Sequence, residues 1–108
     1  MSYDVWLTVD LGGREPAVID GTEWNFTSNI ARMLGATGLR IPEFDGVLAG
    51  ACAARLDVAI RTMTGMPDHF RELEPANGWG SYDQMMPALE KLHDLLKRHP
   101  RATVRVYS

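Results

Sequence analysis

The chain has 108 residues and a mass of 12.0 kDa, enough for one hydrophobic core and too short for two, so we expect a single domain over residues 1–108. Eleven Lys and Arg against fourteen Asp and Glu leave a net charge of −3, which argues against the concentrated basic face of a nucleic-acid-binding protein. Apolar residues at 45% and charged residues at 23% are close to the averages of globular domains and exclude wholesale disorder.

The first ten residues predict a half-buried β-strand. From Tyr3 to Asp10 every second residue is apolar, so one face of the strand carries Tyr3, Val5, Leu7 and Val9. Gly12-Gly13 then breaks the strand, and a short apolar run follows at Ala17-Val18-Ile19. A Gly-Gly turn before such a run predicts a hairpin whose second arm lies within residues 16–26.

The spacing of apolar residues becomes helical after this hairpin. Ile30, Met33 and Leu34 lie three and four positions apart, which predicts a short helix that Thr27 or Ser28 caps. Residues 38–46 are expected to form a loop. Its acidic residues, Glu43 and Asp45, would favour the N-terminus of the next helix through the helix dipole.

A long helix is predicted over residues 47–63, followed by one further helical turn at residues 68–73. The first half of the long helix is rich in Ala and Gly, which lets another backbone approach it closely. Its apolar stripe consists of Leu48, Cys52, Leu56, Ala59, Ile60 and Met63.

The last helix is expected to open at Ser81, because Ser81-x-x-Gln84 fits the capping-box pattern. Pro87 should bend this helix or shift its regular start, and Pro100 should end the helical region. Residues 102–107 then alternate as a closing strand. The buried stripe of the helix is predicted to be Met85, Leu89, Leu92 and Leu96.

This order of elements predicts an α+β fold. We expect a small antiparallel sheet, made of the N-terminal strand or hairpin plus the C-terminal strand, covered on one face by three to four helices. The strands at Tyr3–Asp10 and Ala102–Tyr107 should be neighbours, since neither is stable alone. The two long helices should share a core that contains Leu56, Ile60, Leu89 and Leu92.

The sequence predicts no catalytic residue, no cofactor and no metal site. The three histidines, His69, His93 and His99, lack metal-ligand spacing, and Cys52 falls on an apolar helix stripe where a thiol is usually inert. The carboxylates form no recognisable acid–base pair. The first ten residues lack the basic and apolar regions of a signal peptide, and no apolar run approaches the roughly 20 residues that span a bilayer. We therefore expect a soluble cytoplasmic protein with no membrane partner.

Two asparagine-containing segments are the candidate binding residues, because each lies before a predicted helix. Asn25 and Asn29 belong to the first segment, and Asn77 and Trp79 belong to the second, which is followed by Tyr82. If both helices open toward the same edge of the sheet, these five residues lie close together. Their amides then either tie two loops together through caps and turns, or leave a hollow for a small polar or anionic ligand. Trp79 either fills the edge of the core or is an exposed anchor.

The order of these segments resembles a set of small uncharacterised proteins from actinobacteria and tailed bacteriophages. The resemblance rests on Tyr3-Asp4-Val5-x-Leu7, which leads to Asn25-Phe26-Thr27-Ser28-Asn29-Ile30, and on Asn77-Gly78-Trp79-Gly80-Ser81-Tyr82 before a helix and a final strand. It implies a stand-alone accessory protein, and a phage or mobile-element origin would favour binding to a host component. No activity is implied by it.

Two functions are therefore expected from the sequence. The first is a small accessory protein that binds a host or partner protein without catalysis, with Trp6, Trp24 and Trp79 as candidate exposed aromatic residues. The second is a small-molecule or nucleotide binder, with or without catalysis, that uses a pocket between the two asparagine segments. A flat apolar patch would favour the first function, and a concave pocket where the segments converge would favour the second. The sequence leaves a homo-oligomer open and predicts no nucleic-acid partner.

Overall fold

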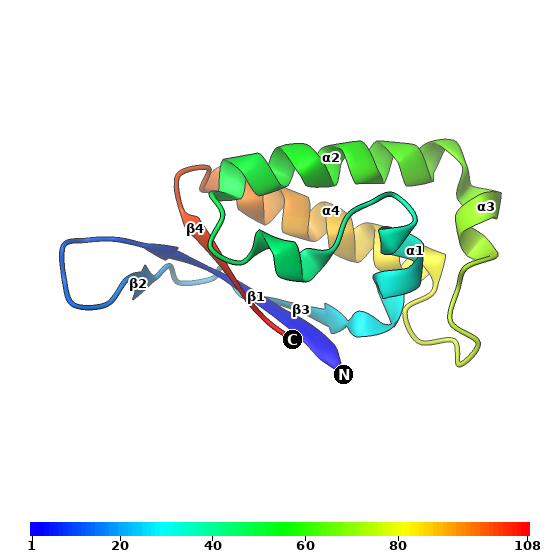
Figure 1. Cartoon of the computed structure of the whole chain (residues 1–108), viewed down its shortest axis with the longest axis horizontal. Helices are drawn as coiled ribbons and strands as arrows, with labels where there is room; N and C mark the ends of the chain where they lie inside the picture. The colour runs from blue at the N-terminus through cyan, green and yellow to red at the C-terminus, as the bar shows by residue number, and fades with distance from the viewer.

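Strand β1 (Ser2–Val9) is the central strand, and every other strand of the antiparallel sheet pairs with it. The computed structural model describes all residues, 1–108 (Figure 1). Asp4 pairs with both β3 (Trp24–Thr27) and β4 (Thr103–Tyr107), and Thr8 pairs with both β4 and β2 (Ala17–Val18). Strands β2 and β3 therefore lie along one edge of β1, and β4 lies along the other.

The interruption between β2 and β3 is bridged by one side chain. Thr22 is 1% exposed, and its hydroxyl accepts a hydrogen bond from the Leu7 N–H (3.2 Å) and donates one to the Ile19 carbonyl (2.6 Å). The hydroxyl thus takes the place of a strand carbonyl where the backbone bulges away from β1. The expected hairpin arm within residues 16–26 is confirmed in this broken form.

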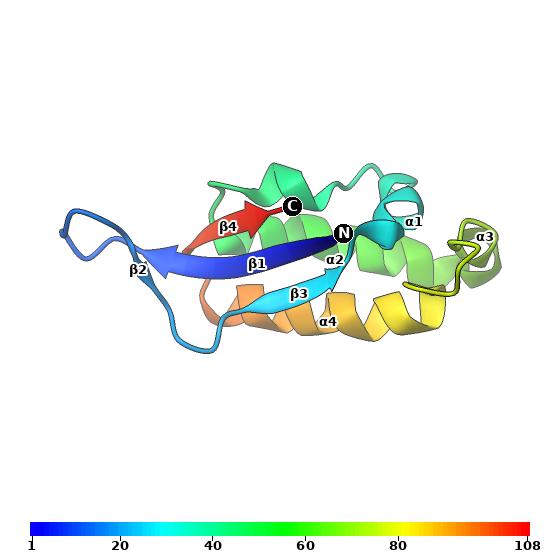
Figure 2. The same ribbon diagram turned by 90° about the horizontal axis from the view of Figure 1, so that it is seen from below.

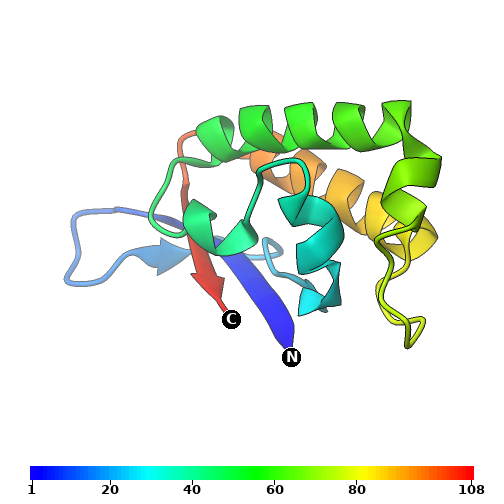
Figure 3. The same ribbon diagram turned by 45° about the vertical axis from the view of Figure 1, so that its right-hand side comes forward.

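The helices pack on one face of the sheet, which confirms the α+β expectation (Figures 1 and 2). The two long helices, α2 (Ala49–Gly65) and α4 (Tyr82–Arg98), lie against each other over the strands. Shorter helical segments complete the layer, as Figure 3 shows from the side. They are η1 (Ser28–Ile30), α1 (Ala31–Gly35), η2 (Ile41–Phe44) and α3 (Pro67–Arg71).

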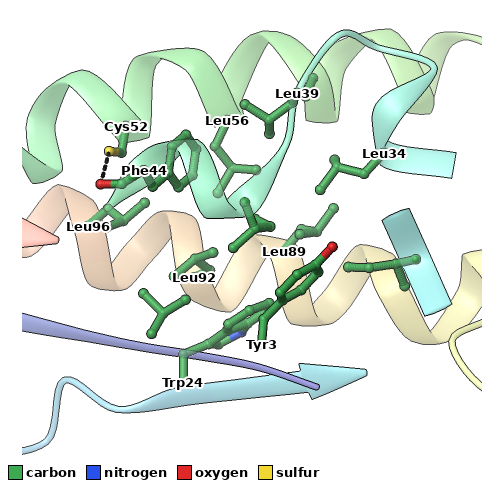
Figure 4. Packing of buried hydrophobic residues seen from close by; sticks show 14 of the residues in the cluster. Tyr3, Trp24, Leu34, Leu39, Phe44, Cys52, Leu56, Leu89, Leu92 and Leu96 are labelled. Atoms are coloured by element: carbon green, nitrogen blue, oxygen red, sulfur yellow. Dashed lines mark hydrogen bonds between the residues drawn. The ribbon is translucent and has the colours of Figure 1, made fainter. Parts of the chain in front are cut away.

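The predicted core is largely confirmed. Leu56, Leu89 and Leu92 are fully buried between the long helices and the sheet (Figure 4). Ile60 is partly buried against the same core. Leu48 is an exception, since it is 55% exposed. Helix α2 begins at Ala49, directly after Leu48. Leu48 therefore lies outside the helical stripe and forms an isolated bridge with Thr103 instead.

The expectation of a simple loop over residues 38–46 is wrong. Ile41 and Phe44, from η2, are completely buried, so this segment contributes to the core.

The acidic residues of this segment, Glu43 and Asp45, bind side chains and backbone elsewhere in the chain, in addition to lying before the N-terminus of α2 as expected. Glu43 lies 3.7 Å from Arg55, and Asp45 accepts hydrogen bonds from the Arg105 side chain and the Val106 N–H, both at 3.0 Å. The Val106 hydrogen bond lowers the pKa of Asp45, with a smaller contribution from Arg105.

The outer edge of β4 is closed by the chain that enters α2. The Gly46 N–H donates to the Val104 carbonyl, and the Val104 N–H donates to the Val47 carbonyl, both at 2.8 Å. One turn further on, the Gly50 N–H donates to the Pro100 carbonyl at 2.9 Å, and a Cβ at Gly50 would lie 3.1 Å from that oxygen. The close backbone approach expected at the start of this helix is therefore confirmed.

Helix α4 opens with the predicted capping box. The Ser81 hydroxyl accepts from the Gln84 N–H (3.3 Å), and the Gln84 side chain accepts from the Ser81 N–H (3.1 Å). Pro87 does not shift the regular start of the helix, which begins directly after Ser81. The carbonyl that Pro87 leaves without a helical donor belongs to Asp83, an exposed residue of the first turn that water can reach.

Shortening Leu92 to Ala should destabilise the protein by about 2–5 kcal/mol, because it removes a fully buried side chain and leaves a cavity. Urea denaturation followed by circular dichroism measures the change. Lys91→Ala, at the neighbouring exposed position, is the control and should change the free energy of unfolding by less than about 0.5 kcal/mol. Equal effects of the two substitutions would contradict the assignment of Leu92 to the core.

Thr22→Val should cost about 1–3 kcal/mol, because the buried Leu7 N–H loses its hydrogen-bond acceptor while the side-chain volume stays nearly constant. Thr22→Ser keeps the hydroxyl and is the matched variant. We expect Ser to be the more stable of the two in the same urea titration. A Val variant as stable as the Ser variant would show that the hydroxyl does not hold the bulge.

Candidate functional site

The two asparagine segments meet in space, as expected. The Asn29 side-chain amide donates to the Trp79 carbonyl at 3.4 Å, although about fifty residues separate them in the sequence. A shallow hollow of about 430 Å³ lies beside this contact, between β3 and the start of α4. Its lining consists of Asn25, Phe26, Thr27, Trp79, Gly80 and Gln84.

The asparagine amides have structural partners in this region. The Asn77 side-chain oxygen accepts from the Trp79 N–H at 3.0 Å, which is an Asx turn within the loop. The Asn25 amide donates to the Asp4 carboxylate at 2.6 Å, across the β1–β3 pair. Asn29 completes the set by joining the two segments. The alternative in which these amides tie loops together is therefore the one that the contacts favour.

Tyr82, one of the candidate binding residues, does not lie at the hollow. It is buried, its hydroxyl donates to the Met63 carbonyl at 3.0 Å, and the Arg71 guanidinium lies 4.8 Å from its ring centroid. As the first residue of α4, Tyr82 faces the end of α2 and not the hollow. Its N–H is held by the Glu74 carboxylate at 2.8 Å. Tyr82 thus connects the start of α4 to the end of α2 and to α3, and its ring is not exposed to a ligand at the hollow.

The structure decides between the two alternatives for Trp79 and corrects the expectation for Trp24. Trp79 is 71% exposed, so the interpretation in which its ring fills the edge of the core is wrong. Trp24 is buried instead of exposed, and its indole N–H donates to the Ala88 carbonyl of α4 at 2.9 Å. The pairing of Trp24 with Val5 places Trp24 on the helix side of the sheet. The second arm is too short and interrupted for its alternation to predict this orientation.

A second candidate surface is the open face of the sheet, on the side away from the helices (Figure 2). Side chains alternate across a strand, so residues between the buried positions of β1 point to this face. The face contains a hollow of about 540 Å³. Its lining includes Asp4, Trp6, Val18, Glu23, Asn25 and Tyr107.

Aromatic and aliphatic groups form the centre of this open face. Trp6 is half-buried and lies opposite Arg105 in the β1–β4 pair, and Tyr107 lies one diagonal step away, opposite Asp4. Tyr107 is 69% exposed and Val18 on β2 is 52% exposed. The ionisable acids of the lining are Asp4 and Glu23, and the lining contains no Lys or Arg. Arg105 is held toward Asp45 at 3.0 Å.

No group of three or more His, Cys, Asp or Glu side chains is arranged to hold a metal ion. Cys52 is fully buried with its sulfur 4.0 Å from the Phe44 carbonyl, and burial raises the pKa of its thiol to about 11, so it stays protonated near neutral pH (Figure 4). None of the helices is both long and apolar enough to cross a membrane.

The alternation of the first strand already indicated the open face, on which Trp6, one of the expected exposed aromatic residues, lies. The strict alternation of Tyr3–Asp10 puts Trp6 on the same face as Asp4, opposite the buried residues. Tyr107 lies on the same open face in the closing strand, opposite Asp4.

The chain matches no protein-family model, no curated protein and no solved structure, so the resemblance to actinobacterial and phage proteins stays a prediction.

Gly80→Ala should separate the two asparagine segments. A Cβ at Gly80 would lie 2.8 Å from Thr27 Cγ2, and Gly80 also has a positive φ of 82°. Gly78→Ala is the matched control, since its φ is 76° and no atom lies within 4 Å of its Cβ. Both substitutions carry the cost of about 1 kcal/mol for a left-handed conformation, and the clash should add roughly 1–3 kcal/mol at Gly80 alone.

Urea denaturation of the two glycine variants measures this difference in stability. In NMR spectra, a change in the chemical shifts of the Asn29 side-chain amide reports that its contact with Trp79 is broken. Equal destabilisation of the two variants, with the Asn29 signal unchanged, would show that the close approach of the segments is not required.

Proposed function

We propose that this protein acts by binding a partner protein on the open face of its sheet, without catalysis. The observation that carries the proposal is the group of Trp6, Val18 and Tyr107, which lie on a face that no element of the chain covers. Aromatic residues contribute large contact areas and are enriched among the residues that dominate protein interfaces. The helices on the other face give this surface a rigid support.

The acidic border of the face indicates what such a partner would present. Asp4 and Glu23 lie beside the aromatic centre, and Arg105, opposite Trp6, is already paired with Asp45. A partner with an apolar centre and Lys or Arg at its border would therefore be complementary in shape and charge. The resemblance to phage and actinobacterial proteins would favour a host component as the partner of a stand-alone accessory protein.

The hollow between the asparagine segments supports a second candidate, a small-molecule or nucleotide binder. The contact of Asn29 with Trp79 and the exposure of the Trp79 ring favour it. The burial of Tyr82 and the internal hydrogen bonds of Asn25 and Asn77 weigh against it. The partner-protein function is therefore the one that the geometry supports better.

Three variants compare the two surfaces. Tyr107→Asp places a charge on the open face at an exposed position, Trp6→Ser removes its centre, and Trp79→Ser removes the exposed ring of the other surface. Each variant is immobilised and used to capture proteins from a lysate of the host cell, with retained proteins identified by mass spectrometry. We expect one protein to be retained by the wild type and by Trp79→Ser, and to fall at least about tenfold on both open-face variants.

Denaturation midpoints measured on the same samples separate loss of binding from loss of folding. Capture that depends on Trp79 and not on the open face would overturn the assignment and favour the asparagine hollow. Retention by all three variants would refute both surfaces. Sedimentation of the wild type alone shows whether a second copy of this chain is the occupant, in which case Tyr107→Asp would convert a dimer to a monomer.

A further inference from the structure

A third hollow has a lining whose ionisable side chains are all hydrogen-bond donors able to bind an anion. It has a volume of about 450 Å³ and lies between the N-terminal half of β1, helix α1 and the segment before η2. Its ionisable residues are Tyr3, Arg32 and Arg40, and it contains no Asp or Glu. In a chain with a net charge of −3, two arginines at one hollow without an acid are not the consequence of a generally basic surface.

The donors of this hollow have no partners within the protein. Neither Arg32 nor Arg40 takes part in any of the ion pairs, which join other arginines to Glu43, Asp45, Asp57, Asp68 and Asp83. Glu43, the acid nearest to Arg40 in the sequence, is directed to Arg55 at 3.7 Å. No side-chain hydrogen bond of the structure involves either of these two guanidinium groups, so their N–H groups are available to a ligand.

Tyr3 provides a fixed donor in the wall of the same hollow. Its ring is buried on the helix side of the sheet, near Leu34 and Leu39, and is 7% exposed (Figure 4). The hydroxyl has no hydrogen-bond partner in the protein, yet it is not among the buried atoms left unpaired, because it reaches the hollow. Burial raises the pKa of Tyr3, which keeps the hydroxyl protonated and therefore a donor at neutral pH.

The geometry points to a binding site for a small organic anion at this hollow, with its phosphate or carboxylate group held by Arg32, Arg40 and the Tyr3 hydroxyl. Guanidinium groups bind both kinds of oxyanion through paired N–H donors, which makes arginine the preferred residue for this task. The volume exceeds that of an inorganic ion and falls in the range of small-molecule pockets. Ala31 and Pro42, both exposed at the hollow, would contact the apolar part of the ligand.

This inference does not rest on the proposed partner-protein function, since the site lies on the helix side of the sheet. Inorganic phosphate, acetate and phenyl phosphate are the probes, each titrated at constant ionic strength with sodium chloride as the reference. Backbone amide shifts of residues 31–42 in NMR spectra report binding. We expect saturable shifts with phosphate or acetate, with dissociation constants on the order of millimolar, and tighter binding of phenyl phosphate.

Arg40→Gln and Tyr3→Phe test the donors, and Arg98→Gln, at an exposed arginine without an ion pair, is the matched control. Arg40→Gln should weaken phosphate binding by roughly tenfold, Tyr3→Phe by about threefold, and Arg98→Gln should leave it unchanged. Spectra that are unchanged beyond the immediate neighbours of each substituted residue establish that each variant is folded.

Three results would overturn the site. The first is a linear response to phosphate that matches the response to chloride. The second is equal weakening by Arg40→Gln and Arg98→Gln. The third is phenyl phosphate binding no tighter than phosphate, which would contradict the proposal that the ligand is an organic anion. The ratio of the phosphate and acetate constants identifies which oxyanion the site prefers.

Discussion

The pairing of β1 with every other strand is the constraint on which this fold depends. An eight-residue strand has two edges, and the chain uses both, with β4 on one edge and the broken β2–β3 arm on the other. Residues from both ends of the chain thereby meet on one strand, and the helices between them have a single face to cover. The remaining edge of β4 is closed by residues 46–49, so this strand has no free edge.

Elements with a regular period could be predicted from the sequence. The alternation of β1 and the stripe of α4 each repeat several times, and the capping box fixes the start of α4 through two side chains. Segment η2 could not be predicted in this way, because four residues are too few to show a helical period. The burial of Ile41 and Phe44 results from their position beneath α2, which is a tertiary property.

The candidate site shows the same division. The proximity of Asn29 and Trp79 could be predicted from the sequence, because both segments precede helices that open toward one edge. The sequence could not say whether each aromatic ring points inward or outward, since this depends on strand register for Trp24 and on the loop path for Trp79. Asparagine is frequent in turns for local reasons, and Asn77 is used in that way here, whereas the Asn25 amide binds Asp4 across the β1–β3 pair.

Strand β1 also separates the two surfaces to which we assign binding. Asp4 lines the open-face hollow, whereas its neighbour Tyr3 lines the arginine hollow, because consecutive side chains of a strand point to opposite faces. The two hollows differ in charge as well, with carboxylates on one side and guanidinium groups on the other. A basic partner segment and a small anion would therefore be sorted to opposite faces by electrostatics, and each can be removed by substitutions that leave the lining of the other hollow intact.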